Sequence, residues 1–269
     1  MSTLRSIGYT TLELLLTPLQ FEVPNSRLRY YLLAKREPLQ FQDVATVPGD
    51  DVWRHIPGQG PAWSDPRFEN KSSPAVAHTI FDYLDDLGEG YAEYAIPDKI
   101  LEKWGRLFDI VKPSSDRTCC FTRGRYLDIT LFYFIIIDAI TLGYTQLVER
   151  AGSILQENED LDVRYDTLTF PSANSLPCQT TAVFDKFLQS QAQGNADAVK
   201  ILHSLRLRYF TPSELLRLFA FDPLRREPAD LNFVWPDSTS KKSKYKLIGN
   251  SINVKVVQAL IEYLFTEPE

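Results

Sequence analysis

A stretch near the amino terminus, residues 24–35, constrains the fold of this chain more than any other. Residues 30–34 form a continuous apolar and aromatic run, which predicts a buried strand. Just before it, Arg27 and Arg29 stand two positions apart, so alternation along an extended chain puts both side chains on one face. Buried guanidiniums need anionic or carbonyl-rich partners. We expect such partners here; the alternative is a pair of surface arginines at a strand end.

Length and composition set the next bounds. The chain has 269 residues, of which 44% are hydrophobic, enough for one large domain or two modest ones. A formal net charge of -6 disfavours a broad, non-specific polyanion binder but leaves room for a local basic groove. The cysteines, two of them adjacent at Cys119 and Cys120, suggest neither a disulfide framework nor a metal site. We expect a reducing location, cytoplasmic or nuclear, and no signal peptide or membrane attachment.

Periodicity and end signals place further elements along the chain. Thr211, Pro212 and Glu214 have the spacing of a capping box with proline in the first helical position. We expect a short helix and a strand within 2–16, broken at Gly8, and a second strand over 107–111. Helices are expected over 97–104, 183–190 and 196–207, and an amphipathic helix from 254. A loop is expected over 37–73, and a short helix or turn within 76–87.

The arginine stretch resembles a motif of the cytosine-5 methyltransferases, Gln-x-Arg-x-Arg. It has the Asn-Ser-Arg-Leu-Arg form of the tRNA-modifying eukaryotic branch, the DNA-methyltransferase-like enzymes that act on aspartate tRNA, and Asn25 stands where most relatives have Gln. Three further stretches resemble family motifs and follow in the family's order: Cys120-Phe121-Thr122, Arg208-Tyr209-Phe210-Thr211-Pro212-Ser213-Glu214 and Gly249-Asn250-Ser251.

The resemblance implies roles for two of these motifs. Arg27 and Arg29 would support the flipped cytosine and its surroundings. Cys120, Phe121 and Thr122 would contact the nucleic acid as part of a target-recognition domain. The partner implied is a tRNA of the aspartate type, or DNA.

The Gly249-Asn250-Ser251 stretch precedes an amphipathic helix, so we expect its backbone amides at a helix start, where they suit a polar or anionic group. A plain turn and cap is the alternative. In the family this motif lines the pocket of S-adenosylmethionine. The resemblance therefore implies that Asn250 and Ser251 contact this cofactor.

The resemblance covers only the second half of the family's motifs. The glycine-bearing cofactor loop, the Pro-Pro-Cys-Gln nucleophile loop and the Glu-Asn-Val motif have no counterpart in the chain. Cys178 lies in a Pro-Cys-Gln sequence, but that sequence comes after the arginine stretch and follows Leu176 instead of a second proline. We therefore do not expect Cys178 to be the nucleophile, and we expect an incomplete cofactor pocket.

Residues 125–143 contain the most apolar run in the chain. Asp128 and Asp138 bracket only a short uncharged segment, less than half of the ~20 apolar residues that a membrane span needs. The run is either a buried strand or, because its deletion joins Cys-Phe-Thr-Arg-Gly to Tyr144 as in the family, a retained intron.

These observations predict an α/β chain: a partial Rossmann-like class I methyltransferase sheet with an inserted small target-recognition domain. We expect core strands in 1–36, the recognition domain with long loops in 37–205, and helices with the cofactor motif returning to the core in 206–269. A sheet without its first strands should expose an apolar edge.

The function implied by the resemblance is S-adenosylmethionine-dependent tRNA cytosine-5 methylation, by a C-terminal portion that is inactive alone. Two alternatives stay open. The chain is a non-catalytic nucleic-acid-binding or regulatory module, or it is one half of a split enzyme that a complementing N-terminal half completes.

Overall fold

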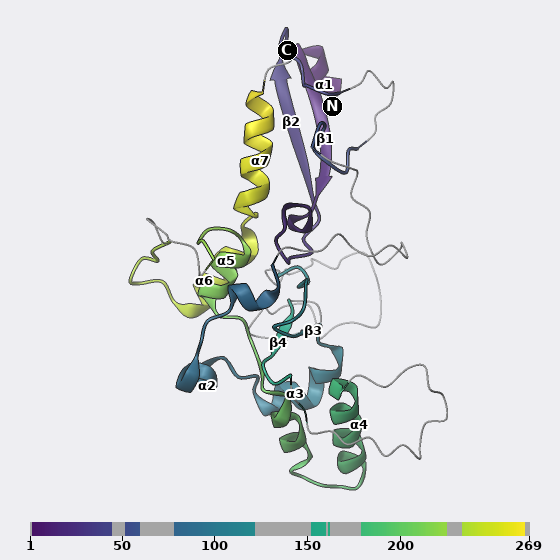
Figure 1. Cartoon of the computed structure of the whole chain (residues 1–269), viewed down its shortest axis with the longest axis vertical. Coiled ribbons are helices and arrows are strands. Elements are labelled where there is room, and N and C mark those ends of the chain that lie inside the picture. Colours follow the sequence, from purple (N-terminus) through teal and green to yellow (C-terminus); the bar gives the residue numbers. More distant parts are fainter. Residues whose placement is uncertain are drawn as a thin grey trace, which may run out of the picture.

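The computed structural model describes residues 2–44, 52–59, 78–121, 152–159, 161, 179–224 and 233–266. The chain is elongated (Figure 1). The buried apolar side chains of its described residues form two separate clusters. Thr122, Cys178 and the 125–143 run lie outside the described residues, so the expectations for them stay predictions.

The upper part of the molecule is built on an antiparallel pair of strands. Helix α1 (Ser2–Ser6) leads into β1 (Tyr9–Leu16), which pairs with β2 (Arg29–Arg36) along its whole length. Gly8, with φ 80°, makes the break between α1 and β1 in a conformation that glycine adopts without strain. The predicted helix, break and two strands are confirmed. The expected burial of residues 30–34 is wrong for Tyr30 (51% exposed) and Leu32 (39% exposed), because the described residues cover only the other face of β2. A short 3-10 helix, η1 (Pro18–Phe21), lies between the strands.

One face of this sheet is covered by the last helix, α7 (Val254–Phe265). The hydroxyl of Tyr263 donates to the carbonyl of Gln42 (2.7 Å) and the ammonium of Lys35 to that of Thr266 (2.8 Å), which fixes the carboxyl end of the helix on the sheet. The cluster between helix and sheet consists of Leu12, Leu14, Leu16, Phe41, Ile56, Val256, Leu260 and Tyr263.

The lower part of the molecule surrounds a second, smaller sheet. Strand β4 (Ile154–Gln156) lies between β3 (Ile110–Val111), to which it is parallel, and β5 (Leu207–Arg208), to which it is antiparallel. The helices of this part are η2 (Ile80–Tyr83), η3 (Gly88–Gly90), α2 (Tyr91–Tyr94), α3 (Asp98–Trp104), η4 (Gly105–Leu107), α4 (Gln179–Ala192), η5 (Ala198–Leu205), α5 (Pro212–Leu218) and α6 (Lys241–Asn250).

Two predicted elements differ in detail. The strand expected over 107–111 is reduced to β3, because the chain first closes a 3-10 turn at Gly105–Leu107. The helix expected over 196–207 is the 3-10 helix η5, which ends where Arg206 takes a left-handed conformation (φ 50°) before β5.

The mixed α/β class is confirmed. The segment 206–269 is divided between the two clusters: side chains up to Ile248 belong to the lower one, and those from Val256 to the upper one. The domain boundaries themselves stay a prediction.

A fully buried ion pair fixes the start of α5. Both terminal nitrogens of Arg208 donate to the carboxylate of Glu214 (2.8 and 2.9 Å), and the Arg208 Nε donates to Glu157 after β4. The predicted capping box is present: Thr211 Oγ1 accepts from the Glu214 amide (3.1 Å), and the Thr211 amide donates to the Glu214 carboxylate (2.7 Å). Burial alone would lower the pKa of Arg208, but the hydrogen bonds to Glu214 and Glu157 raise it. Arg208 is therefore charged at every relevant pH.

We expect Glu214→Ala to lower the free energy of unfolding by about 3–5 kcal/mol, because it leaves the buried charge of Arg208 without its main partner. The matched control is Asp197→Ala, which breaks an ion pair with Lys200 in which both side chains are exposed and should cost less than about 1 kcal/mol. Urea unfolding followed by circular dichroism measures both. Equal losses for the two variants would contradict the assignment.

Candidate functional site

The loop before β2 contacts a segment that lies far away in the sequence. The side-chain amide of Asn25 is buried and donates to Thr118 Oγ1 (2.9 Å) and to the carbonyl of Cys119 (3.1 Å). The amide of Ser26 donates to the carbonyl of Thr118 (2.8 Å), so the two segments pair as a short bridge. This bridge places the Cys-Phe stretch beside the arginines.

Arg27 joins three parts of the chain through its guanidinium. Nη2 donates to the carbonyls of Gly249 (3.0 Å) and Ser251 (2.9 Å). Nη1 donates to the carbonyl of Phe121 and to Cys120 Sγ (3.2 Å). The side chain is only 4% exposed, and this burial lowers its pKa. The carbonyl-rich partner expected from the sequence is present. We call Arg27, Arg29, Cys120, Phe121, Gly249 and Ser251 the arginine site.

Both arginines reach the same sulfur atom. Arg29 Nη2 lies 3.3 Å from Cys120 Sγ, and Arg29 Nη1 donates to the carbonyl of Leu28 (2.9 Å). Arg29 is half-exposed, and its remaining N–H groups make no hydrogen bond to the described residues. The two arginines therefore differ: protein groups occupy both terminal nitrogens of Arg27, whereas Arg29 keeps donors for a ligand.

The adjacent cysteines have different surroundings. The Cys119 amide donates to Ser153 Oγ (2.7 Å), and burial raises the pKa of the Cys119 thiol to about 12. Near neutral pH this thiol stays protonated, and a protonated thiol is a poor nucleophile. The Cys120 sulfur instead lies beside two cationic groups.

The expected position of the Gly-Asn-Ser stretch is wrong. Gly249 lies in the last turn of α6 and Ser251 is the C-cap, because Tyr245 and Ile248 bury one side of that helix and extend it to residue 250. The start of α7 comes later and is capped by Asn253, whose side-chain oxygen accepts from the amide of Val256 (3.3 Å). The stretch therefore presents carbonyl oxygens, not amides, and Arg27 binds two of them.

The end of α6 has features that fit part of S-adenosylmethionine. The carboxyl end of a helix carries partial negative charge, which favours cationic and hydrogen-donating groups, and this cofactor has a sulfonium, an ammonium and ribose hydroxyls. Asn250 is exposed there, whereas the hydroxyl of Ser251 donates to the carbonyl of Ile248 (2.7 Å). The carbonyls of Gly249 and Ser251 already bind the Arg27 guanidinium, so the exposed side-chain amide of Asn250 is the group left for the cofactor's polar atoms, and contact of Asn250 and Ser251 with the cofactor stays a prediction.

The structure brings most of the predicted site residues together. Arg27, Arg29, Cys120 and Ser251 meet at the arginine site, with Asn250 beside it. Phe121 contributes its carbonyl, but its ring is buried against Phe210 (5.4 Å between centroids), so it belongs to the core. The nucleic-acid contacts of this motif stay predictions.

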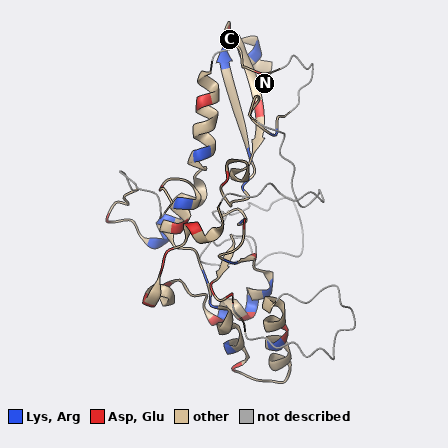
Figure 2. Ribbon diagram, viewed as in Figure 1, with Lys and Arg blue, Asp and Glu red and all other residues tan. Residues whose placement is uncertain are grey.

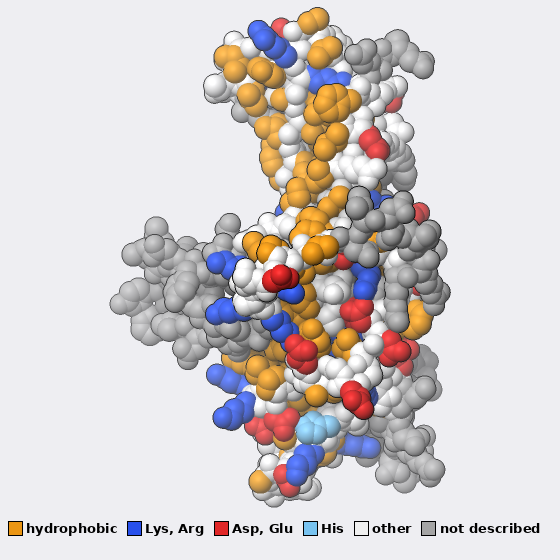
Figure 3. All heavy atoms as spheres, turned by 90° about the vertical axis from the view of Figure 1, so that its left-hand side faces the viewer, with side chains coloured by type: hydrophobic (Ala, Val, Ile, Leu, Met, Phe, Trp, Pro, Cys, Tyr) orange, Lys and Arg blue, Asp and Glu red, His pale blue; other side chains and the backbone are white. Residues whose placement is uncertain are grey.

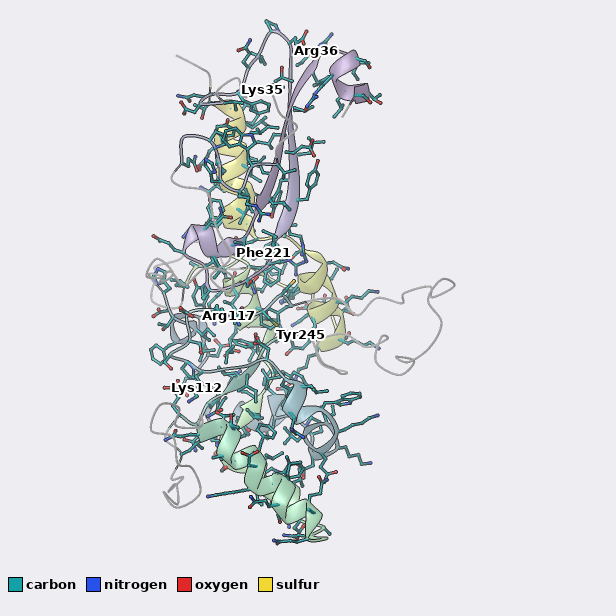
Figure 4. The ribbon with its side chains drawn as sticks, turned by 90° about the vertical axis from the view of Figure 1, so that its right-hand side faces the viewer. Lys35, Arg36, Lys112, Arg117, Phe221 and Tyr245 are labelled. Atoms are coloured by element: carbon teal, nitrogen blue, oxygen red, sulfur yellow. The ribbon has the colours of Figure 1, made fainter. Side chains whose placement is uncertain are left out.

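The sequence analysis did not identify the residues that pack against Arg27 and join the neighbouring segments. Phe219 places its ring 5.2 Å from the guanidinium carbon of Arg27, and its carbonyl accepts from the amide of Val254 (2.9 Å). The carbonyl of neighbouring Leu218 accepts from Asn253 (3.0 Å). Figure 4 shows Tyr245 of α6 and Phe221 in this central part of the molecule. No sequence signal marks such contacts, because they join residues distant along the chain.

The described residues contain no group of three or more His, Cys, Asp or Glu side chains that could hold a metal ion. Among the helices described, none is both long and apolar enough to span a bilayer.

The site and the fold agree with the comparisons. The model of the family described as "C-5 cytosine-specific DNA methylase" matches residues 1–266. The chain therefore belongs to the cytosine-5 methyltransferase family, and the resemblance found in its motifs is confirmed. Its mixed α/β fold is consistent with a Rossmann-like methyltransferase fold.

Two proteins related in sequence have names that are narrower than the family description. The tRNA (cytosine(38)-C(5))-methyltransferase of Schizosaccharomyces pombe is 33% identical over 262 residues, which are 97% of this chain and 56% of that protein. The protein of the same name from Homo sapiens is 28% identical over 305 residues, 98% of this chain and 65% of its own length. This chain thus spans between about half and two thirds of these relatives.

Two solved structures are similar to this chain in fold. A triple mutant of Spodoptera frugiperda DNMT2 superposes with a TM-score of 0.62 at 27% identity, covering 98% of this chain and 60% of the other. Schizosaccharomyces pombe Dnmt2 gives 0.53 at 30% identity, covering 98% and 58%.

We expect Arg27→Lys to lower the free energy of unfolding by about 2–4 kcal/mol, because an ammonium cannot serve all the buried carbonyls that the guanidinium now binds. Arg29→Lys, in a half-exposed side chain, should cost less than about 1 kcal/mol and serves as the matched control. Chemical unfolding measures both. If Arg27→Lys is as stable as Arg29→Lys, Arg27 does not hold the three segments together.

The pKa of Cys119 predicts its alkylation. In a Cys120→Ser/Cys178→Ser variant at pH 8, iodoacetamide should modify Cys119 on the order of 10³ times more slowly than in the unfolded chain, because the thiolate fraction is that much smaller. The folded-state pKa is raised, so the rate should keep rising tenfold per pH unit well above pH 9, where the unfolded chain levels off. Mass spectrometry follows the reaction. A plateau near pH 9 in the folded protein would contradict the assignment.

Proposed function

We propose that this chain is the part of a tRNA cytosine-5 methyltransferase that supports the target base and one edge of the S-adenosylmethionine site. The arginine site is the observation that carries the proposal. Three stretches that resemble family motifs, distant in sequence, meet on the guanidinium of Arg27. The names of the relatives from Schizosaccharomyces pombe and Homo sapiens favour tRNA as substrate, of the aspartate type by resemblance; a relative from Dictyostelium discoideum is named as a DNA (cytosine-5)-methyltransferase.

The two arginines have separate roles in this proposal. Arg29 contacts the substrate, because its unused N–H groups can donate to a pyrimidine carbonyl or a phosphate. Arg27 is a positioning residue, since it acts through the segments it binds. Cys120 accepts from both and keeps the Arg29 guanidinium in place.

Asn250 and Ser251 form one edge of the cofactor site. S-adenosylmethionine supplies the methyl group when it is bound. The exposed amide of Asn250 hydrogen-bonds to its polar atoms, next to the carbonyls of Gly249 and Ser251 that bind Arg27. This pocket is incomplete, because the chain has no counterpart of the family's glycine-bearing loop.

The chain supplies no nucleophile. The reaction needs a thiolate that adds to C6 of a flipped cytosine and an acid near N3. The thiol of Cys119 stays protonated, the sulfur of Cys120 accepts from both arginines and holds Arg29 in place, and the sequence around Cys178 departs from Pro-Pro-Cys-Gln. The chain by itself therefore transfers no methyl group, and it acts as one half of a split or longer enzyme. A non-catalytic RNA-binding or regulatory module is the alternative.

Helix α6 supports an RNA partner despite the negative net charge. It carries basic and no acidic side chains (Figure 2). The Lys244 ammonium lies 5.7 Å from the ring centroid of Trp235, whereas Lys241, 3.7 Å from that of Tyr94, is already paired with Glu93 (3.2 Å). Cationic and aromatic groups together suit phosphates and unstacked bases. The lysines of this helix are Lys241, Lys242, Lys244 and Lys246.

The location also belongs to the proposal. Cys119 and Cys120 are unpaired, and free adjacent thiols persist in a reducing compartment. We therefore place the protein in the cytoplasm or nucleus.

The test combines the chain with the part of the Schizosaccharomyces pombe relative that it does not match. Purified chain alone should incorporate no radiolabelled methyl group into tRNA from S-adenosylmethionine, whereas the co-expressed pair should. In the pair, Arg29→Ala should lower the rate at least tenfold, because a substrate contact is lost. Arg36→Ala, the same change at the other end of β2, should leave it within twofold (Figure 4).

The outcomes separate the alternatives. Methylation by the chain alone would refute its inactivity. Binding of tRNA by the chain, with no turnover in any combination, would favour the non-catalytic module. If the pair methylates DNA faster than tRNA, the proposed tRNA substrate is wrong and DNA is the substrate.

A further inference from the structure

Cys119 and Cys120 are adjacent, partly exposed free thiols with different neighbours. Burial of the Cys119 thiol, together with the charge of Asp109, raises the pKa of that thiol to about 12. The Cys120 sulfur instead accepts from Arg27 Nη1 (3.2 Å) and Arg29 Nη2 (3.3 Å). Reactive cysteines lie in electropositive, partly exposed surroundings. Of these two residues, only Cys120 has such surroundings.

The Cys120 sulfur is placed to accept hydrogen bonds more than to donate one. Among the described residues its S–H has a single acceptor, the carbonyl of Phe121, at the long distance of 3.8 Å. Arg27 cannot turn away from the sulfur, because its Nη2 binds the carbonyls of Gly249 and Ser251. The positive charge beside Cys120 is therefore a fixed part of the fold, and it favours a reaction partner that carries negative charge.

Arg29 can bind such a partner. Its Nη1 donates to the carbonyl of Leu28 and its Nη2 to Cys120, and its remaining N–H groups make no hydrogen bond to the described residues. A guanidinium binds a carboxylate through short, charge-assisted hydrogen bonds. The free N–H groups of Arg29 stand next to the sulfur, so one molecule can place a carboxylate on Arg29 and a reactive group at Cys120.

The helix that meets Arg27 adds positive charge on one side of the site. Helix α6 contains four lysines and no acidic residue, and its last turn supplies the Gly249 carbonyl to Arg27. Figure 3 shows Lys and Arg side chains, with some acidic ones among them, on the face of the molecule that carries this helix. A local basic region attracts anions even when the net charge of the chain is -6.

We propose that Cys120 is a modification site for anionic disulfides, the class to which glutathione disulfide belongs, and that Arg29 selects them by binding a carboxylate of the reagent. The Cys120 thiolate attacks one sulfur of the reagent, so that an Sγ–S bond forms, the S–S bond of the reagent breaks, and the displaced half leaves as a thiolate. The proton of the Cys120 thiol passes to solvent. A free thiol reverses the exchange.

The adduct changes the arginine site. Its carboxylate occupies the N–H groups of Arg29 that the proposed function assigns to the substrate, and its bulk lies where Cys120 now holds the guanidinium. The modified chain therefore supports a target base poorly until a thiol removes the adduct. This regulatory effect rests on the proposed function, whereas the modification itself depends only on the surroundings of Cys120.

The test uses two single-thiol forms of the full chain. Cys119→Ser/Cys178→Ser keeps Cys120, and Cys120→Ser/Cys178→Ser keeps Cys119. The probes are glutathione disulfide, which is anionic, and cystamine, a cationic disulfide, and mass spectrometry follows the adducts at pH 8. Each rate is divided by the rate of the same thiol in the urea-unfolded chain, which removes differences in the intrinsic reactivity of the reagents.

The normalised rates have defined expected values. For Cys120, glutathione disulfide should react about tenfold or more faster than cystamine, because the fixed guanidiniums attract one reagent and repel the other. With glutathione disulfide, Cys120 should react roughly 100-fold or more faster than Cys119, whose thiol stays protonated. Added salt should reduce the preference of Cys120 for the anionic reagent.

Arg29→Gln tests the recognition of the carboxylate. In the form that keeps Cys120, it should lower the normalised rate with glutathione disulfide about tenfold or more and bring the rates of the two reagents close together. A purely structural role of Arg29 would slow both reagents equally. Arg36→Gln, the same change at the other end of β2, is the matched control and should alter the rates less than twofold. Circular dichroism checks that the variants are folded.

Three results would overturn the proposal. The first is equal normalised rates of Cys120 with the two reagents, and the second is a preference for glutathione disulfide that survives Arg29→Gln. The third is a Cys119–Cys120 disulfide as the main product in the unmutated chain, which mass spectrometry distinguishes as a loss of two hydrogens instead of a gain of the glutathionyl group.

The regulatory effect is tested in the methylating pair. Glutathione disulfide should lower its rate about tenfold or more, and dithiothreitol should restore it. The Cys120→Ser pair, compared with its own untreated rate, shows how much of the loss comes from other thiols. An equal fractional loss in both pairs contradicts the regulatory effect. If the pair methylates nothing while Cys120 of the chain is modified as described, the proposed function alone is wrong.

Discussion

The guanidinium of Arg27 is the interaction on which the site depends. It is buried, and it binds the carbonyls of Phe121, Gly249 and Ser251, so removing it would take a buried donor away from each of them. Such groups are costly to leave unpaired. The three segments are therefore held at fixed positions relative to one another, and Arg29 is left as the arginine whose donors can serve a substrate.

The rest of the structure supports this junction from both sides. Above it, α7 packs on the β1–β2 sheet; below it, the buried pair of Arg208 and Glu214 fixes α5, which precedes Phe219 and its contact with Arg27. The described residues on the two sides of the arginine site belong to the two buried clusters.

Much of the local structure could be predicted because its causes are local. The break at Gly8, the capping box of Thr211 and Glu214, and the strand pattern around residue 30 follow from backbone freedom, side-chain reach and alternation. The Gly-Asn-Ser stretch could not be placed. Whether Gly249 ends one helix or begins the next depends on the burial of Tyr245 and Ile248, which is decided by residues distant in the sequence.

The sequence alone determined the family, two strands near the amino terminus and the demand of two close arginines for carbonyl partners, since these depend on residue types at fixed spacing. Only the tertiary structure decided which carbonyls those are, and that protein groups bind both terminal nitrogens of Arg27 whereas Arg29 keeps N–H groups that no described residue binds. The reason is physical: a hydrogen bond between residues more than 200 positions apart depends on the path of the whole backbone, and no local pattern specifies that path.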